Sequence, residues 1–159
     1  MAIRSLLITI SILAISACGF QLKGSYTLPE QYQQIQLQVS DPYSAITRDV
    51  TKRLKDGGVE IVSSQGESHP TLVLGKDTLE RSNLSLYPDG QVAEYRLTYS
   101  LEASVLEANK PARQLSLQVQ RDYLDDPRQA LAKKREMEVL LSEMRQQISD
   151  QLMVQLASQ

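Results

Sequence analysis

The sequence predicts an α+β fold: a single domain with two helices packed on one face of a four-stranded mixed sheet, in the order β-α-β-β-β-α. Three observations predict it. The chain has 159 residues, the length of one ordinary domain. Apolar and polar residues alternate over three segments, as in half-buried strands, and a fourth segment is rich in leucine. Two further segments follow an Asp-Pro pair and repeat apolar residues every three or four positions, as in amphipathic helices that cover one side of a sheet.

The first strand and the first helix are predicted side by side. Residues 32–39 alternate, with apolar residues on one face and glutamines on the other: Ile35, Leu37 and Val39 against Gln34, Gln36 and Gln38. The helix that follows is expected to have Asp41 as its N-cap and Pro42 as its first residue. Its apolar residues are spaced four apart, at Ile46, Val50 and Leu54. Gly57 and Gly58 are expected to end it.

Three more strands are predicted over residues 71–86, 91–107 and 113–124, and the second alternates most regularly. Proline, glycine and asparagine mark the turns between them, at 88–90 and 109–111. The short apolar run at 59–62 could start a strand, but it is not counted among the four. Strands this long predict an elongated sheet.

The last helix is predicted from about residue 127 to 157, with Asp126 as N-cap and Pro127 at its first position. At 1.5 Å per residue it would be roughly 45 Å long, enough to lie along the long strands. Its core stripe is expected to be apolar: Leu131, Met137, Leu141, Met144, Ile148, Leu152 and Leu156.

The N-terminus reads as an export signal. Arg4 precedes a short apolar run at residues 6–15, which is too short for a comfortable transmembrane helix. The next residues, Ile15-Ser16-Ala17-Cys18, resemble the lipobox of bacterial lipoproteins, in which the cysteine thiol receives a diacylglycerol. We therefore expect residues 1–17 to be a removed signal peptide, 18–31 a lipidated tether and 32–159 the folded domain. The alternative is an ordinary signal peptide with a chance cysteine.

Composition removes several classes of function. The net charge of −2 argues against a nucleic-acid partner, and a single cysteine and a single histidine leave no cysteine- or histidine-built metal site. No cofactor is expected. His69 with Ser63 or Ser64 could suggest a hydrolase triad, but a histidine in a polar loop without a nucleophile elbow is better explained as solvated. Asp125 and Asp126 precede a proline and are better explained as a helix cap. The sequence therefore predicts no enzyme.

Three motifs carry a resemblance to a known family. They are CGFQLKG at residues 18–24, DGQVAEY at 89–95 and DPRQALAK at 126–133. Together, and in this order, they resemble the lipopolysaccharide-assembly lipoprotein family, LptE. The resemblance implies a lipid-anchored protein on the periplasmic side of the cell outer membrane. It also implies a domain that plugs the lumen of the LptD β-barrel, assists assembly of that barrel and takes part in inserting lipopolysaccharide at the cell surface. Lipopolysaccharide itself is an implied ligand.

Basic residues early in the last helix are the candidate lipopolysaccharide contacts. Lys133 and Lys134 lie where the helix dipole favours anions, so helix stability does not account for them, while lipopolysaccharide carries phosphates that lysine complements. Both lie outside the expected apolar stripe, so we expect neither to be buried. In the family, the position that matches Lys133 is tied to lipopolysaccharide contact. The competing explanation is a solvated helix face.

The hairpin turn departs from the family pattern. The family has a second basic residue in this turn, and this sequence has Pro88 there. Arg81 or Arg96 could compensate. Tyr87, at the hairpin tip, is a candidate partner contact, whereas Tyr95, Tyr99 and Tyr123 are expected in the sheet core: all three alternate with polar residues.

One other class of function fits the signal, the lipid and a small α/β domain. That alternative is a generic lipid-anchored periplasmic scaffold, or a pilotin-type subunit of another envelope machine. It does not account for three motifs in family order. Gly19 after the cysteine, rather than aspartate, favours the outer membrane.

Overall fold

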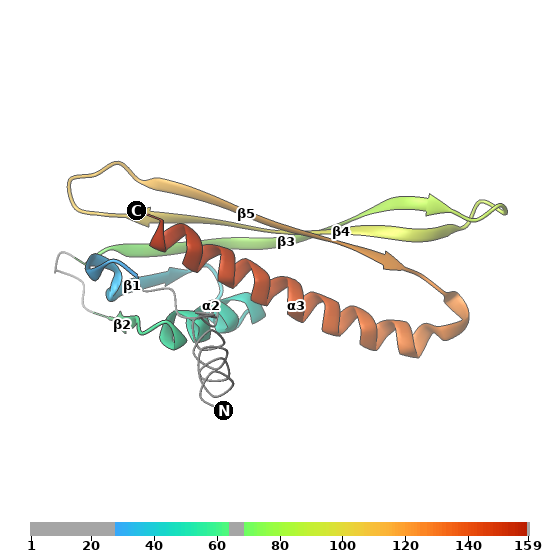
Figure 1. Ribbon diagram of the computed structural model, residues 1–159, viewed down its shortest axis with the longest axis horizontal. Helices are drawn as coiled ribbons and strands as arrows, with labels where there is room; N and C mark the ends of the chain where they lie inside the picture. The colour runs from blue at the N-terminus through green and yellow to red at the C-terminus, as the bar shows by residue number, and fades with distance from the viewer. Residues whose placement is uncertain (1–27, 64–68, 159) are drawn as a thin grey trace, which may run out of the picture.

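A computed structural model describes residues 28–63 and 69–158. The predicted signal peptide 1–17, Cys18, Gly19 and Ser64 lie outside the described residues. The elements are η1 (Glu30–Tyr32), β1 (Gln34–Val39), α2 (Ala45–Asp56), β2 (Glu60–Val62), β3 (Thr71–Leu86), β4 (Val92–Leu106), β5 (Arg113–Leu124), η2 (Pro127–Gln129) and α3 (Ala130–Ala157). Both α-helices lie on the same side of one elongated sheet (Figure 1).

The sheet has five strands, in the order β2-β1-β3-β4-β5, rather than the four predicted. The added strand is β2, which pairs in parallel with β1 through Glu60 opposite Gln34. It has three residues, too few to show an alternating pattern, so only its pairing with β1 makes it a strand. The α+β class, the mixed sheet and the two helices are confirmed. β1 is parallel to both neighbours, whereas β3, β4 and β5 run antiparallel.

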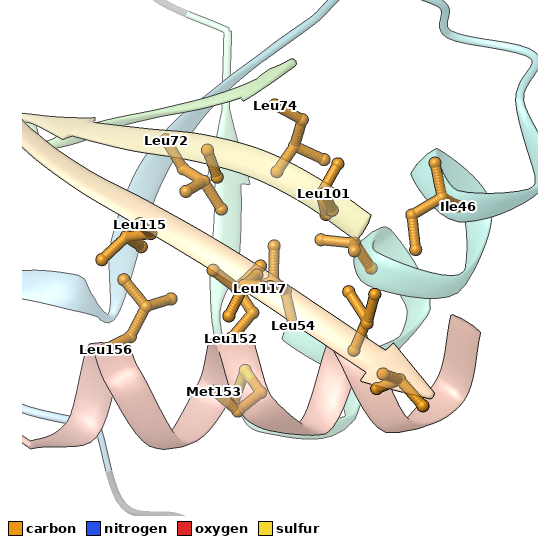
Figure 2. Close-up of a cluster of buried hydrophobic side chains, with 14 of the residues drawn as sticks. Ile46, Leu54, Leu72, Leu74, Leu101, Leu115, Leu117, Leu152, Met153 and Leu156 are labelled. Atoms are coloured by element: carbon orange, nitrogen blue, oxygen red, sulfur yellow. The ribbon is translucent and has the colours of Figure 1, made fainter. Parts of the chain in front are cut away.

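The hydrophobic core lies between the helices and the side of the sheet that faces them (Figure 2). Its fully buried side chains come from the strands and from both helices, including Leu72, Leu101, Leu117, Ile46, Leu54, Met144, Ile148 and Leu152. Leu28 is also buried in this cluster, ahead of the first strand. The opposite side of the sheet is polar: Glu102, Gln114, Ser116, Gln118 and Gln120 are exposed there. The amphipathic strand pattern therefore separates a core side from a polar outer side.

The first helix begins three residues later than predicted. Ser44, not Asp41, is its N-cap, and the Ser44 hydroxyl accepts a hydrogen bond from the Thr47 amide at 3.2 Å. Asp41 instead closes a tight turn, because its carboxylate accepts the Tyr43 amide at 2.8 Å. Pro42 suits that turn as well as it suits a first helical turn, so the Asp-Pro pair did not identify the start.

The last helix is confirmed, but its first turns face a different way than predicted. Asp126 caps the short η2 segment by accepting the Arg128 amide at 3.0 Å, and α3 continues from it. Leu131 was expected in the core stripe and is 83% exposed, so that expectation is wrong. Lys133 lies over the ring of Tyr123 in β5. Residues two apart on a helix point about 200° apart, so Leu131 must face away from the sheet.

Candidate functional site

The far end of β3 extends past the part of the sheet that the helices cover, whereas α3 still covers Leu97 of β4 and Tyr123 of β5. We call residues 78–86 of β3, 92–99 of β4 and 119–124 of β5 the distal half of the sheet; it ends in the β3–β4 hairpin (Figure 1). Every residue from Thr78 to Leu84 is exposed, so neither helix covers this stretch of β3. Three exposed leucines lie along it: Leu79, Leu84 and Leu86.

A glycine controls which side chains of β3 face the helices. The β3–β4 register shifts between Leu74 and Asp77. A Cβ atom on Gly75 would lie 2.8 Å from the carbonyl oxygen of Glu102, so only glycine allows the two backbones to approach this closely. Beyond the irregularity Asp77 is opposite Leu101 and Arg81 is opposite Leu97. Arg81 therefore points to the same side of the sheet as α3.

Two cations and two tyrosines form a row across this side. The Arg81 guanidinium lies 4.3 Å from the centre of the Tyr95 ring. Tyr95 is paired with Tyr123 across β4 and β5. The Lys133 ammonium lies 5.1 Å from the centre of the Tyr123 ring. We call these four residues the cation–tyrosine row. The tyrosine faces attract the two cations and hold them on one surface.

Lys133 is more covered than the sequence predicted. Its side chain is 15% exposed, and its ammonium donates to the Glu136 carboxylate at 2.9 Å. That hydrogen bond raises the pKa of Lys133. The Tyr123 hydroxyl also donates to the Lys133 carbonyl oxygen at 3.1 Å. The expectation that Lys133 is unburied is therefore wrong, because its alkyl chain lies on the sheet while its charge stays paired.

The side chain of Lys134 is not buried, as predicted. It is exposed, and it forms no hydrogen bond or ion pair with any residue in the ranges 28–63 and 69–158. Arg96, the other candidate to compensate for Pro88, is on the polar outer side, where its guanidinium pairs with Asp122 at 3.0 Å. Of the two candidates, only Arg81 shares a surface with Lys133.

The three tyrosines expected in the sheet core lie in it or against it. Tyr99 and Tyr123 are buried and Tyr95 is half-buried against the core. The Tyr99 hydroxyl donates to the Asp77 carboxylate. Burial, with that hydrogen bond, raises the pKa of Tyr99 well above its usual range.

Tyr87 is at the hairpin tip and is 42% exposed. The turn below it is the predicted one: Gly90 has φ +86° and donates to the Tyr87 carbonyl oxygen at 2.9 Å. The side chain is accessible, and its role as a partner contact stays a prediction.

The described residues hold no group of three or more His, Asp, Glu or Cys side chains placed to bind a metal ion. Among the same residues, no helix has the length and apolar character needed to cross a membrane.

A family model described as lipopolysaccharide-assembly, LptE, matches residues 32–156, which is nearly all of the described fold. The chain belongs to the LptE family. The LPS-assembly lipoprotein LptE of Pectobacterium atrosepticum is 35% identical over 149 residues, covering 93% of this chain and 81% of that protein. The protein of the same name from Photorhabdus laumondii is 32% identical over 154 residues, covering 97% and 85%.

A solved structure supports the same assignment. The rare lipoprotein B of Shewanella oneidensis has 49% sequence identity and a TM-score of 0.73, covering 79% of this chain and 94% of its own. As an LptE-family member the chain is a non-enzymatic lipopolysaccharide-assembly lipoprotein of the outer membrane. The family match therefore decides against the generic scaffold and the pilotin-type subunit.

Sequence analysis predicted roles for Lys133, Lys134 and Arg81 separately, but it did not predict that they lie close together. The connection depends on the register of three strands and on the irregularity at Gly75. Alternation in β4 and β5 places Tyr95 and Tyr123 on the core side, and that signal could have paired them.

Proposed function

We propose that this protein is the lipid-anchored partner of the LptD β-barrel. Its domain plugs the barrel lumen and assists assembly of the barrel. It also binds lipopolysaccharide during transport and insertion at the cell surface. The observation that carries the proposal is the LptE-family match over residues 32–156. The lipid is proposed on Cys18, the only cysteine of the chain.

The outer side of the sheet supports a plug. Large barrels have hydrophilic interiors, so a plug needs a polar surface. Side chains there already form polar pairs, such as Ser116 with Glu102 at 2.7 Å and Arg96 with Asp122. We expect cross-linkers at Gln118 or Thr98 to capture the barrel. If only cross-linkers on the helices captured it, the assignment of faces would be wrong.

The partner is tested by affinity purification from solubilised outer membranes. LptD is expected to co-purify with the full-length protein and to be identified by mass. A photo-reactive residue at Tyr87 should cross-link to LptD, whereas one at Tyr43, which is 84% exposed on another part of the chain, is the matched control. Recovery of a different envelope complex without LptD would overturn the proposal.

The lipopolysaccharide contact is proposed at Lys134, with Lys133 and Arg81 beside it in the cation–tyrosine row. Lysine and arginine complement the phosphates of lipopolysaccharide, and Lys134 forms no ion pair or ring contact with the described residues, whereas Lys133 is paired with Glu136 and Arg81 lies on the Tyr95 ring. Lys134→Glu should weaken binding of lipopolysaccharide at low salt. The loss should shrink at high salt, because exposed charges are screened over about 8–10 Å at physiological ionic strength.

The matched control is Lys55→Glu, an exposed lysine on α2. Lys133→Glu is a less clean test, since it also removes the contacts with Tyr123 and Glu136. Equal lipopolysaccharide affinities of wild type, Lys134→Glu and Lys55→Glu at low salt would show that Lys134 is only part of a solvated helix face.

A further inference from the structure

Lys133 and Lys134 are neighbours in the proposed lipopolysaccharide contact, but the structure treats them differently. The Lys133 side chain is 15% exposed, and its ammonium donates to the Glu136 carboxylate at 2.9 Å. Lys134 is exposed and forms no ion pair with residues 28–63 and 69–158. A ligand phosphate therefore meets two lysines of different kinds, and one of them, Lys133, already shares its charge with a carboxylate.

Two contacts with Tyr123 fix where Lys133 lies. The Lys133 ammonium is 5.1 Å from the centre of the Tyr123 ring, and the Lys133 carbonyl oxygen accepts the Tyr123 hydroxyl at 3.1 Å. Tyr123 is buried in the sheet, so neither contact moves easily. The contact with Glu136 is different, because the Glu136 side chain is 53% exposed. Glu136 is therefore the partner of Lys133 that can move aside for a ligand.

The Glu136 carboxylate and a ligand phosphate compete for the same ammonium. Both are anions, so they repel each other when they approach Lys133 together. A phosphate that binds Lys133 must displace the carboxylate, or bind against its repulsion at close range. In either case Glu136 lowers the affinity of this site for a phosphate.

The competition is moderate and reversible. An exposed ion pair between residues three apart on a helix contributes little to stability, so a bound phosphate can break it. When the phosphate leaves, Glu136 lies less than one helical turn from Lys133 and can pair with it again. The helix dipole gives Glu136 little stabilisation, because this residue lies past the first turn of α3. The position of the carboxylate therefore matters chiefly to Lys133.

We propose that Glu136 is a release residue: its carboxylate competes with a lipopolysaccharide phosphate for the Lys133 ammonium, and it pairs with Lys133 again when the ligand leaves. A protein that takes part in transport needs a site that binds its cargo and also lets it go. Lys134 and Arg81 attract the ligand, and Glu136 limits how long the ligand stays. The inference rests on the proposed lipopolysaccharide contact and adds the residue that sets its lifetime.

Binding kinetics test the release residue. Lipopolysaccharide in detergent is bound to the immobilised full-length protein at low salt, and the association and dissociation rates are measured. Glu136→Gln removes the competing charge and keeps the shape of the side chain. It should raise the affinity about two- to fivefold, mostly through slower dissociation, as in most affinity changes within one site.

Glu138→Gln is the matched control. Glu138 is exposed on the same helix and forms no ion pair within the described part of the chain. The substitution removes the same charge from the same end of α3 without breaking a contact. It should therefore slow dissociation less than Glu136→Gln does.

A double-mutant cycle shows whether Glu136 acts through Lys133. Lys133→Met keeps an unbranched side chain over the Tyr123 ring and removes the charge. In the Lys133→Met background, Glu136→Gln should slow dissociation no more than Glu138→Gln does, because the coupling has been removed. A purely structural role of Glu136 would leave the dissociation rate unchanged in both backgrounds. Circular dichroism of each variant checks that the chain is folded.

Three results would overturn the proposal: a Glu136→Gln protein that releases lipopolysaccharide as fast as wild type, a Glu138→Gln protein that slows release equally, or an undiminished effect of Glu136→Gln in the Lys133→Met background. The proposed lipopolysaccharide contact fails on a different result, which is a Lys134→Glu protein that binds as tightly as wild type. A loss with Lys134→Glu and an unchanged rate with Glu136→Gln would refute the release residue alone.

Discussion

Leucine-to-alanine changes at two positions of α3 should have opposite consequences. Leu152 is 1% exposed and belongs to the core cluster, whereas Leu131 on the same helix is 83% exposed. Truncating a buried leucine loses its transfer free energy and leaves a cavity, which together cost about 2–5 kcal/mol. Leu131→Ala loses little burial, and alanine is the stronger helix former, so its effect should stay within about 0.5 kcal/mol.

The assay is urea unfolding followed by circular dichroism on a soluble chain that begins after Cys18. Leu152→Ala should lower the free energy of unfolding by about 3 kcal/mol with an unchanged slope, a large part of the roughly 5–15 kcal/mol of a typical domain. Its melting temperature should fall on the order of 10 °C. If Leu131→Ala cost as much as Leu152→Ala, the first turns of α3 would be packed in solution, and the orientation argued from Lys133 and Tyr123 would be refuted.

Three other predictions follow. Cys18→Ser should abolish acylation, seen as a loss of mass, and leave the circular dichroism unchanged; a collapsed spectrum would show that the cysteine supports the fold. Gly75→Ala should cost about 1–3 kcal/mol in urea unfolding, because its Cβ would lie 2.8 Å from the Glu102 carbonyl oxygen; an unchanged midpoint would contradict this. A hydrogen bond from Lys110 lowers the pKa of Glu107. The ionised Glu107 carboxylate therefore stabilises the fold at pH values above the ordinary glutamate pKa, and this stabilisation is lost as the pH falls through the lowered pKa. Glu107→Gln should therefore lose less stability than wild type between about pH 7 and about pH 3.

The sequence alone determined most of the elements. The predicted strands at 91–107 and 113–124 and the helix that ends at 157 match the structure closely, because period-2 and period-3.6 patterns are local properties of the chain. The turn at 88–90 was equally readable, since Gly90 supplies the positive φ that the turn requires. The family resemblance was also local, carried by three short motifs, and the comparison with known proteins confirmed it.

Tertiary structure decided everything that depends on what lies opposite a residue. β2 is a strand only because β1 lies beside it, and Ser44 rather than Asp41 caps α2. Lys133 rather than Leu131 faces the sheet. The spacing of apolar residues along a helix shows which of them share a face, but it does not show which element packs against that face.

The candidate site and the unpaired edge of β3 also depend on the tertiary structure. Arg81 reaches Tyr95 only because the strand irregularity at Gly75 sets the register of β3. The unpaired edge exists because β1 ends its pairing at Leu74 while β3 continues for twelve more residues, to Leu86. Such features come from contacts between segments far apart in the chain, and the periodicity of a single segment carries no information about them.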